Sequence, residues 1–168
     1  FGATPRRNAR NMPTIDKPII GNTDPGLYET DFYAWTQRQA DLLRLEEFSE
    51  VDWHNLIEEI ETLGRSEKHE IKNRLTVLIM HLLKWQYQFE RRPRSWRITI
   101  AIQRVDLADL LTDNPSLHTH LAEFITAAYP SAVKKAVIET RLPKATFPVT
   151  CPYTAAQILD EEFWPDPD

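Results

Sequence analysis

An acidic stretch flanked by histidines is the part of the sequence whose side chains could bind a metal ion. Residues 55–70, NLIEEIETLGRSEKHE, contain five glutamates and His69, and His54 precedes them. At 100° per residue, His54, Glu58 and Glu61 fall on one face of a helix. Imidazole and carboxylate groups are common metal ligands in proteins. These three residues therefore form a candidate metal set.

The same helical wheel favours a solvated flank over a metal site. The apolar stripe of this segment lies to one side of the carboxylates and consists of Trp53, Leu56, Ile57, Ile60 and Leu63. Di-iron bundles direct Glu-x-x-His motifs inward from several helices, and no Glu-x-x-His occurs in the sequence. Glu61 can instead pair with Arg65 one turn later. We therefore predict no metal ion and no cofactor, and keep His54, Glu58 and Glu61 as the alternative.

Other catalytic motifs are missing from the sequence. It contains no His-Glu-x-x-His, no paired Cys-x-x-Cys, no glycine-rich phosphate loop and no Gly-x-Ser-x-Gly elbow. Cys151 has no base near it in sequence, and His118 and His120 would point about 200° apart on a helix. His81 falls on a polar stripe that we expect to face water, with Arg74, Lys84 and Gln88. These observations favour a protein without catalytic activity.

A cluster of arginines and tryptophan, here called the basic turn, is the best candidate binding patch. It spans residues 91–97 and contains Arg91, Arg92, Arg94, Trp96 and Arg97. Arginines after a helix can offset its dipole and stack on an indole such as that of Trp85, which is a structural role. The alternative is contact with an anion, a nucleic acid or an acidic protein. The acidic end of the chain, 160–168, could be its partner within one molecule or between subunits.

The elements that must position these residues are helices. Apolar periodicity and capping residues predict helices over these segments: 31–45, 52–63, 66–89, 95–111, one from 114 that Pro130 kinks or divides, and a short one from 154. Gly64 is expected to end the second, and Ser66 to cap the third. Thr154 and Gln157 form a capping box. The third helix is apolar nearly all round, so we predict an all-α, compact bundle of five or six helices around residues 66–89.

Length and charge set the domain organisation and the expected compartment. A chain of 168 residues suits one domain, here an extended, proline-rich N-terminal arm at 1–27, a helical domain at 28–165 and an acidic tail at 166–168. The net charge of −5 disfavours a general nucleic-acid binder. A single cysteine suits a reducing interior, and no apolar run could span a membrane. We expect a cytoplasmic protein.

Several segments resemble one bacterial family. They are YETDFYAWTQRQADLLR, DWHNLIEEIETLGRSEKHEI, LLKWQYQ, RSWRITI and CPYTAAQILDEEFWP. In this order they are similar to domain of unknown function family 29, over roughly residues 27–165. The resemblance implies a compact helical domain of bacterial origin, and it implies no reaction.

Two hypotheses on function follow. The first is a cytoplasmic helical interaction module without catalysis, whose partner is a protein; the net charge disfavours nucleic acid without excluding it, and a homo-oligomer stays open. The second is a metal-dependent enzyme or nucleic-acid processor with a site assembled from distant helices. In that case carboxylates from residues 54–70 would meet His118, His120 or the arginines.

Overall fold

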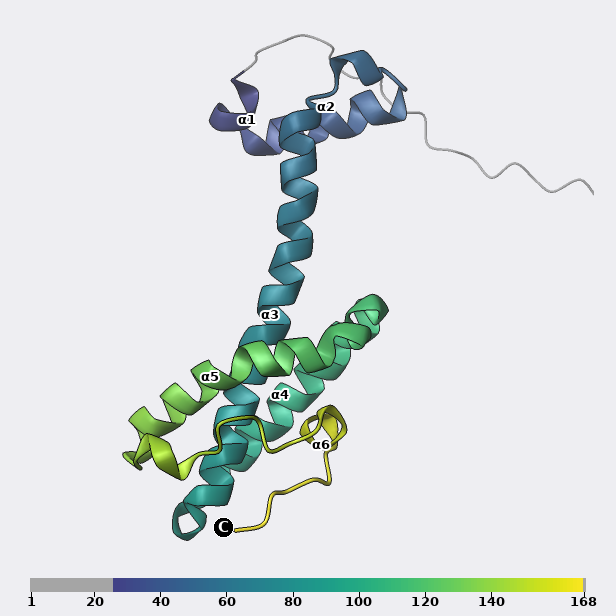
Figure 1. Cartoon of the computed structure of the whole chain (residues 1–168). Helices are drawn as coiled ribbons and strands as arrows, with labels where there is room; N and C mark the ends of the chain where they lie inside the picture. The colour runs from purple at the N-terminus through teal and green to yellow at the C-terminus, as the bar shows by residue number, and fades with distance from the viewer. Residues whose placement is uncertain (1–25, 168) are drawn as a thin grey trace, which may run out of the picture. The chain divides into compact units, whose positions relative to one another are not determined.

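The computed structural model describes residues 26–167, which fold into helices joined by turns and contain no strand. The α-helices of this part are α1 (Leu27–Thr30), α2 (Phe32–Arg44), α3 (Trp53–Tyr87), α4 (Arg94–Asp113), α5 (Leu121–Thr140) and α6 (Ala155–Leu159). The predicted all-α class is confirmed (Figure 1). Most of the predicted N-terminal arm, residues 1–25, lies outside the described residues. The chain divides into two compact units, one ending at Glu59 and one beginning at Ile60, whereas the predicted domain limits stay predictions.

The first unit is held by an aromatic cluster and two aspartate caps. Asp31 accepts a hydrogen bond from the Ala34 N–H (3.0 Å), which confirms the predicted start of α2. The ring of Tyr28 meets the Trp35 ring edge-on, with 4.9 Å between centroids, and Trp35 Nε1 donates to Asp52 (3.2 Å). Asp52 also accepts from the Asn55 N–H (3.3 Å) at the start of α3, as the sequence predicted.

The predicted break at Gly64 is wrong. Helix α3 continues through Gly64 and Ser66 to Tyr87, so the central helix begins at Trp53 and not near residue 66. Gly64 does not adopt the positive φ that a glycine stop requires. The good helix formers on both sides outweigh the cost of one glycine, about 1 kcal/mol. Of the apolar stripe on this stretch, the side chains of Trp53, Ile57, Ile60 and Leu63 are exposed.

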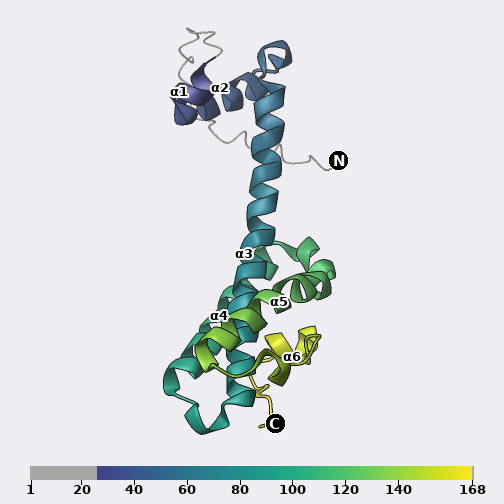
Figure 2. The ribbon, with the colours of Figure 1, turned by 60° about the vertical axis from the view of Figure 1, so that its left-hand side comes forward.

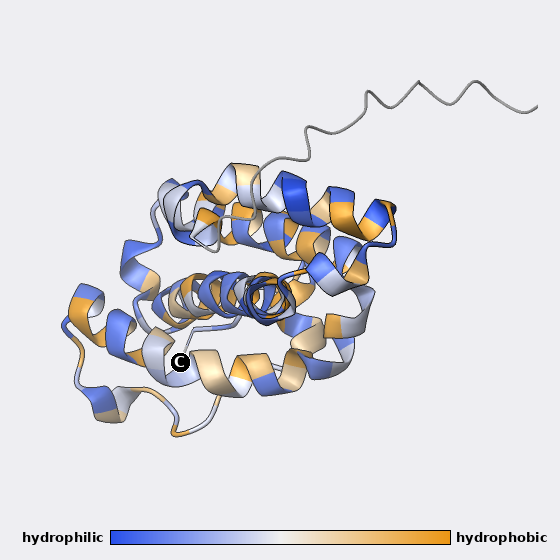
Figure 3. Ribbon diagram, turned by 90° about the horizontal axis from the view of Figure 1, so that it is seen from above, coloured by the Kyte–Doolittle hydropathy of each residue, from blue (hydrophilic) through white to orange (hydrophobic). Residues whose placement is uncertain are grey.

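The core of the second unit lies where the later part of α3 meets α4 and α5 (Figures 1 and 2). The largest fully buried side chains come from these helices and from α6: Ile71, Leu75, Leu78, Ile79, Leu82, Leu83, Ile100, Leu107, Leu111 and Ile158. Figure 3 shows apolar and polar residues alternating along the helices, as amphipathic packing requires. The expectation of a helix that is apolar nearly all round, made for Leu75 to Phe89, agrees with the burial of Leu75, Leu78, Ile79, Met80, Leu82 and Leu83.

The polar stripe expected to face water instead packs against neighbouring helices. Lys84 is buried and pairs with Glu139 of α5. Arg74 pairs with Glu70 (2.7 Å) and with Asp106 of α4, and Gln88 Nε2 donates to the Thr140 carbonyl (3.0 Å). His81 is partly buried, with Nδ1 2.9 Å from the Val77 carbonyl oxygen. The sequence of α3 alone gives no sign that acidic residues of the two later helices α4 and α5 pair with its polar stripe.

Two further predicted boundaries are corrected, and one is confirmed. Asn114-Pro115 begins a 3-10 turn, η3 (Pro115–His120), and α5 starts only at Leu121. Helix α5 then runs through Pro130 to Thr140 without being divided. The predicted capping box of α6 is present, with Thr154 and Gln157 bonded reciprocally.

Candidate functional site: the arginine–tryptophan face

Arg92 closes the turn that follows α3. Its Nε donates to the carbonyl of Trp85 (2.9 Å), which lies in the last turn of the helix, where carbonyls have no partner within the helix. The guanidinium carbon also stands 4.8 Å from the centre of the Trp85 ring. Its Nη2 is buried with no hydrogen-bond partner among the described residues. Arg92 therefore has the structural role suggested by the sequence: it offsets the dipole at the end of α3 and stacks on the Trp85 indole.

A buried arginine on α4 fixes the C-terminal segment beside this turn. Arg104 is only 2% exposed, on the same helix face as Ile100, Leu107 and Leu111. It donates to backbone carbonyls beyond α5: Ile158 (2.9 Å), Phe163 (2.8 Å), Glu161 (3.2 Å) and, at 3.5 Å, Gln157. Burial lowers the pKa of Arg104, while the Asp160 and Glu161 carboxylates oppose this shift. The guanidinium thus satisfies carbonyls of α6 and of the segment that follows it.

The segment held by Arg104 brings Trp164 against the basic turn. The rings of Trp164 and Trp85 are 4.7 Å apart between centroids. Arg97 and Arg104 each place a guanidinium over the Trp164 ring, at 5.5 Å and 5.6 Å from its centre. Trp164 is thereby the floor of a surface hollow of about 360 Å³, whose lining residues are Arg94, Arg97, Ile98, Ala101 and Trp164. We call these five residues the arginine–tryptophan face.

The charge on this face is uncompensated. Both Arg94 and Arg97 are exposed, and neither forms an ion pair within residues 26–167. They also stand in the first turn of α4, where the helix dipole is positive and disfavours a cation by roughly 0.3–1 kcal/mol. An anion above the hollow would offset both the repulsion between the two guanidinium groups and their unfavourable interaction with the helix dipole. The apolar floor of Ile98 and Trp164 would suit an apolar group on the same ligand.

The remaining members of the basic turn face elsewhere. Trp96 lies over Lys84, whose Nζ is 4.3 Å from the ring centre. Arg91 ends the 3-10 turn η2 (Phe89–Arg91) and is exposed. Up to Asp166, the acidic end of the chain (160–168) makes no ion pair with the basic turn, so its observed link to this region is Trp164 rather than its carboxylates. Asp168 lies outside the described residues.

Sequence reasoning missed Arg104 and Trp164. The spacing Ile100, Arg104, Leu107 places the arginine in the apolar stripe of its helix, and that was the available signal. A charge in such a stripe is buried only with partners. Nothing in the sequence indicates that these partners are carbonyls more than fifty residues later.

The candidate metal residues His54, Glu58 and Glu61 all lie on α3. In residues 26–167 no group of three or more histidine, cysteine, aspartate or glutamate side chains gathers closely enough to hold a metal ion. Glu61 pairs with Arg65 (3.3 Å), as expected for a solvated flank. His120 Nδ1 lies 3.2 Å from the carboxylate of Glu123, three residues later. The structure therefore does not join His54, Glu58 and Glu61 to ligands from another helix.

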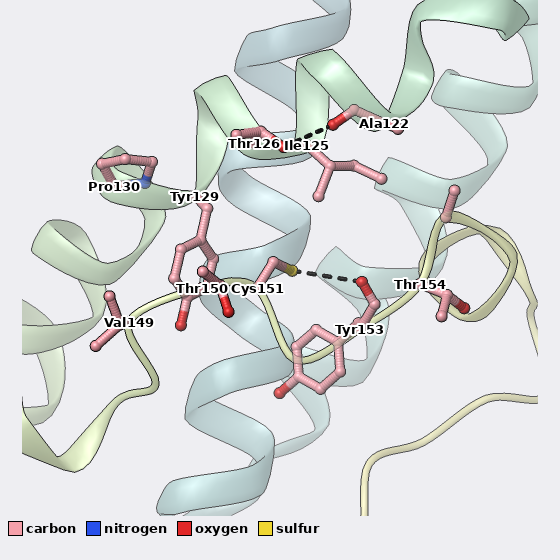
Figure 4. Close-up of a pocket in the computed structure, with 11 residues that line it drawn as sticks. Ala122, Ile125, Thr126, Tyr129, Pro130, Val149, Thr150, Cys151, Tyr153 and Thr154 are labelled. Carbon is pink, nitrogen blue, oxygen red and sulfur yellow. Dashed lines mark hydrogen bonds between the residues drawn. The ribbon is translucent and has the colours of Figure 1, made fainter.

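A second hollow, of about 410 Å³, lies between α5 and residues 149–155 (Figure 4). The Cys151 Sγ is 3.6 Å from the Tyr153 carbonyl oxygen, to which the thiol donates. Burial raises the pKa of this thiol, so at neutral pH it is protonated and a poor nucleophile. No charged residue and no histidine lines the hollow. It therefore lacks the base that nucleophilic catalysis by Cys151 would need.

Fold and surface together define an all-α protein with an exposed arginine–tryptophan face. The chain belongs to the family described as Domain of unknown function DUF29, whose model matches residues 27–164. No curated protein and no solved structure matches it. None of the helices in the described part combines the length and apolar character needed to cross a bilayer.

Proposed function

We propose that the protein is a helical interaction module without catalytic activity, and that its arginine–tryptophan face binds an acidic segment of a partner protein. The observation that carries this proposal is the pair Arg94 and Arg97, exposed and without carboxylate partners in residues 26–167, at the rim of an apolar hollow. We place the module in the bacterial cytoplasm, for which the single cysteine is the support.

Charge complementarity selects the occupant. The lining contains two arginines and no acidic side chain, so an acidic segment is favoured and a basic one is repelled. Arginine forks bind carboxylates in a bidentate manner. The floor of Ile98, Ala101 and Trp164 then offers a place for one apolar side chain of the same segment, since aromatic residues often anchor protein interfaces.

Fluorescence anisotropy tests the proposal. The probe is a labelled peptide of alternating glutamate and leucine, and its lysine–leucine counterpart is the charge control. We expect Arg94→Ala/Arg97→Ala to weaken binding of the acidic peptide by about tenfold or more. Arg92 is left intact, because it bonds to the carbonyl of Trp85 and its loss would disturb the fold.

The matched control is Lys134→Ala/Lys135→Ala, which removes the same charge from exposed positions on α5. An equal loss of acidic-peptide binding in the two double variants would show that net charge alone explains the effect. It would refute the arginine–tryptophan face as the binding site. Equal binding of both peptides would refute recognition of an acidic segment.

A further inference from the structure

Four basic side chains of α3 line a third, smaller hollow in the second unit. Arg65, Lys68, His69 and Lys72 follow the spacing i, i+3, i+4 and i+7, which places them on one side of the helix. The hollow has a volume of about 150 Å³, and its remaining lining residue is Phe124 from α5. Sequence reasoning considered Arg65 and His69 only beside the acids of this stretch, and it did not consider Lys68 and Lys72.

The basic side chains of this hollow differ in whether they are paired with an acid. Arg65 pairs with Glu61, whereas Glu67 is bonded to Asn114, Glu70 to Arg74 and Glu123 to His120. The side chains of Lys68 and Lys72 have no hydrogen bond or ion pair with any of residues 26–167. Two ammonium groups therefore stay uncompensated on a chain whose net charge is −5.

The wall of the hollow strengthens this field. Phe124 is partly buried and packs against the hydrophobic core, so it is a firm apolar surface. It also lies in the first turn of the twenty-residue helix α5, near the positive end of the helix dipole. A low-dielectric wall on one side of a charged hollow raises the local potential and the local concentration of anions.

We infer that this hollow binds the phosphate group of a small phosphorylated molecule. The lysines supply the point charges that hold a phosphate group, and Arg65 lies beside them with its Nη atoms bonded to Glu61 (3.3 Å) and Thr62 (2.7 Å). The volume equals that of about five water molecules at about 30 Å³ each. That space holds one phosphate group and leaves the rest of the ligand outside. The inference does not depend on the arginine–tryptophan face.

Titration with inorganic phosphate, followed by ¹H–¹⁵N correlation spectra at constant ionic strength, tests the inference. We expect saturable shifts at residues 65–72 and Phe124, with chloride as the reference anion. Lys68→Ala/Lys72→Ala should weaken phosphate binding by about tenfold, and the charge-keeping Lys68→Arg/Lys72→Arg should retain it. Lys134→Ala/Lys135→Ala should change it by less than about twofold.

Three results would overturn the inference. They are equal shifts with chloride and phosphate, equal losses in the two alanine double variants, and shifts centred on residues 94–97 instead of 65–72. A ten-nucleotide single-stranded DNA is a further arm. If it bound through Lys68 and Lys72 much more tightly than phosphate, a nucleic acid would replace the small phosphorylated molecule as the ligand. Failure of the acidic-peptide assay would leave this result untouched, because the two assays use different residues.

Discussion

Removing the buried guanidinium of Arg104 should release the C-terminal segment and cost about 3 kcal/mol of unfolding free energy. Three carbonyls accept from it at 3.2 Å or less, on Ile158, Glu161 and Phe163. Hydrogen bonds to a charged donor contribute roughly 1.5–3 kcal/mol each. Removing the guanidinium also removes the free-energy cost of burying its charge, which offsets part of this loss. The expected net loss of unfolding free energy is therefore about 1 kcal/mol for each carbonyl. Arg104→Met keeps most of the side-chain volume and isolates this polar loss.

Urea unfolding of Arg104→Met measures the free energy, and hydrogen exchange locates the damage. Amides of residues 158–164 should exchange faster, whereas those of α3 between Leu75 and Leu83 should keep their relative protection. Arg97→Met is the matched control, because Arg97 also lies on α4 and also contacts the Trp164 ring, but its side chain is exposed. It should cost less than about 0.5 kcal/mol. Equal costs for the two variants, or unchanged exchange at 158–164, would refute the role given to Arg104.

Three further changes test the packing of the second unit by urea unfolding. Glu139→Ala should cost about 2–3 kcal/mol because it leaves the buried Lys84 ammonium unpaired, whereas Lys84→Met should be near neutral; equal costs would contradict this. Burial lowers the pKa of His81 below its usual 6.5. The folded protein therefore favours the neutral imidazole, and the stability that His81 contributes is fully present above pH 6.5. It should be lost as the pH falls through the folded pKa, and His81→Leu should flatten this part of the pH profile. Gly64→Ala should add about 0.5–1 kcal/mol, because a Cβ there meets open space within a helix; destabilisation would instead support the helix stop that the sequence suggested.

The predicted fold class held because it depends on local patterns. Helical periodicity, the aspartate caps at Asp31 and Asp52, and the capping box at Thr154 involve residues a few positions apart. Local boundaries failed where two local signals compete. Gly64 can end a helix or lie within one, and the sequence alone does not decide between them. Pro130 likewise has no N–H to donate within the helix, yet it does not end α5.

The candidate site was predictable only in part. The arginines of the basic turn stand out by composition, and the structure brings Arg94 and Arg97 to one hollow. The same structure turns Trp96 toward Lys84 and uses Arg92 to close a helix end. Trp164, which completes the hollow, is more than sixty residues further along the chain.

The sequence by itself determined the helical character of this protein, most of its helix starts and the clusters of charge along the chain. These depend on neighbours within about one helical turn, whose interactions the order of residues fixes. Only the tertiary structure decided which charges are buried and which stay free. Lys84 has a partner on α5 and Arg104 has partners in α6 and after it, whereas Lys68 and Arg94 have none among the described residues. Burial and pairing are properties of the assembled core, because the partners come from segments that only folding brings together.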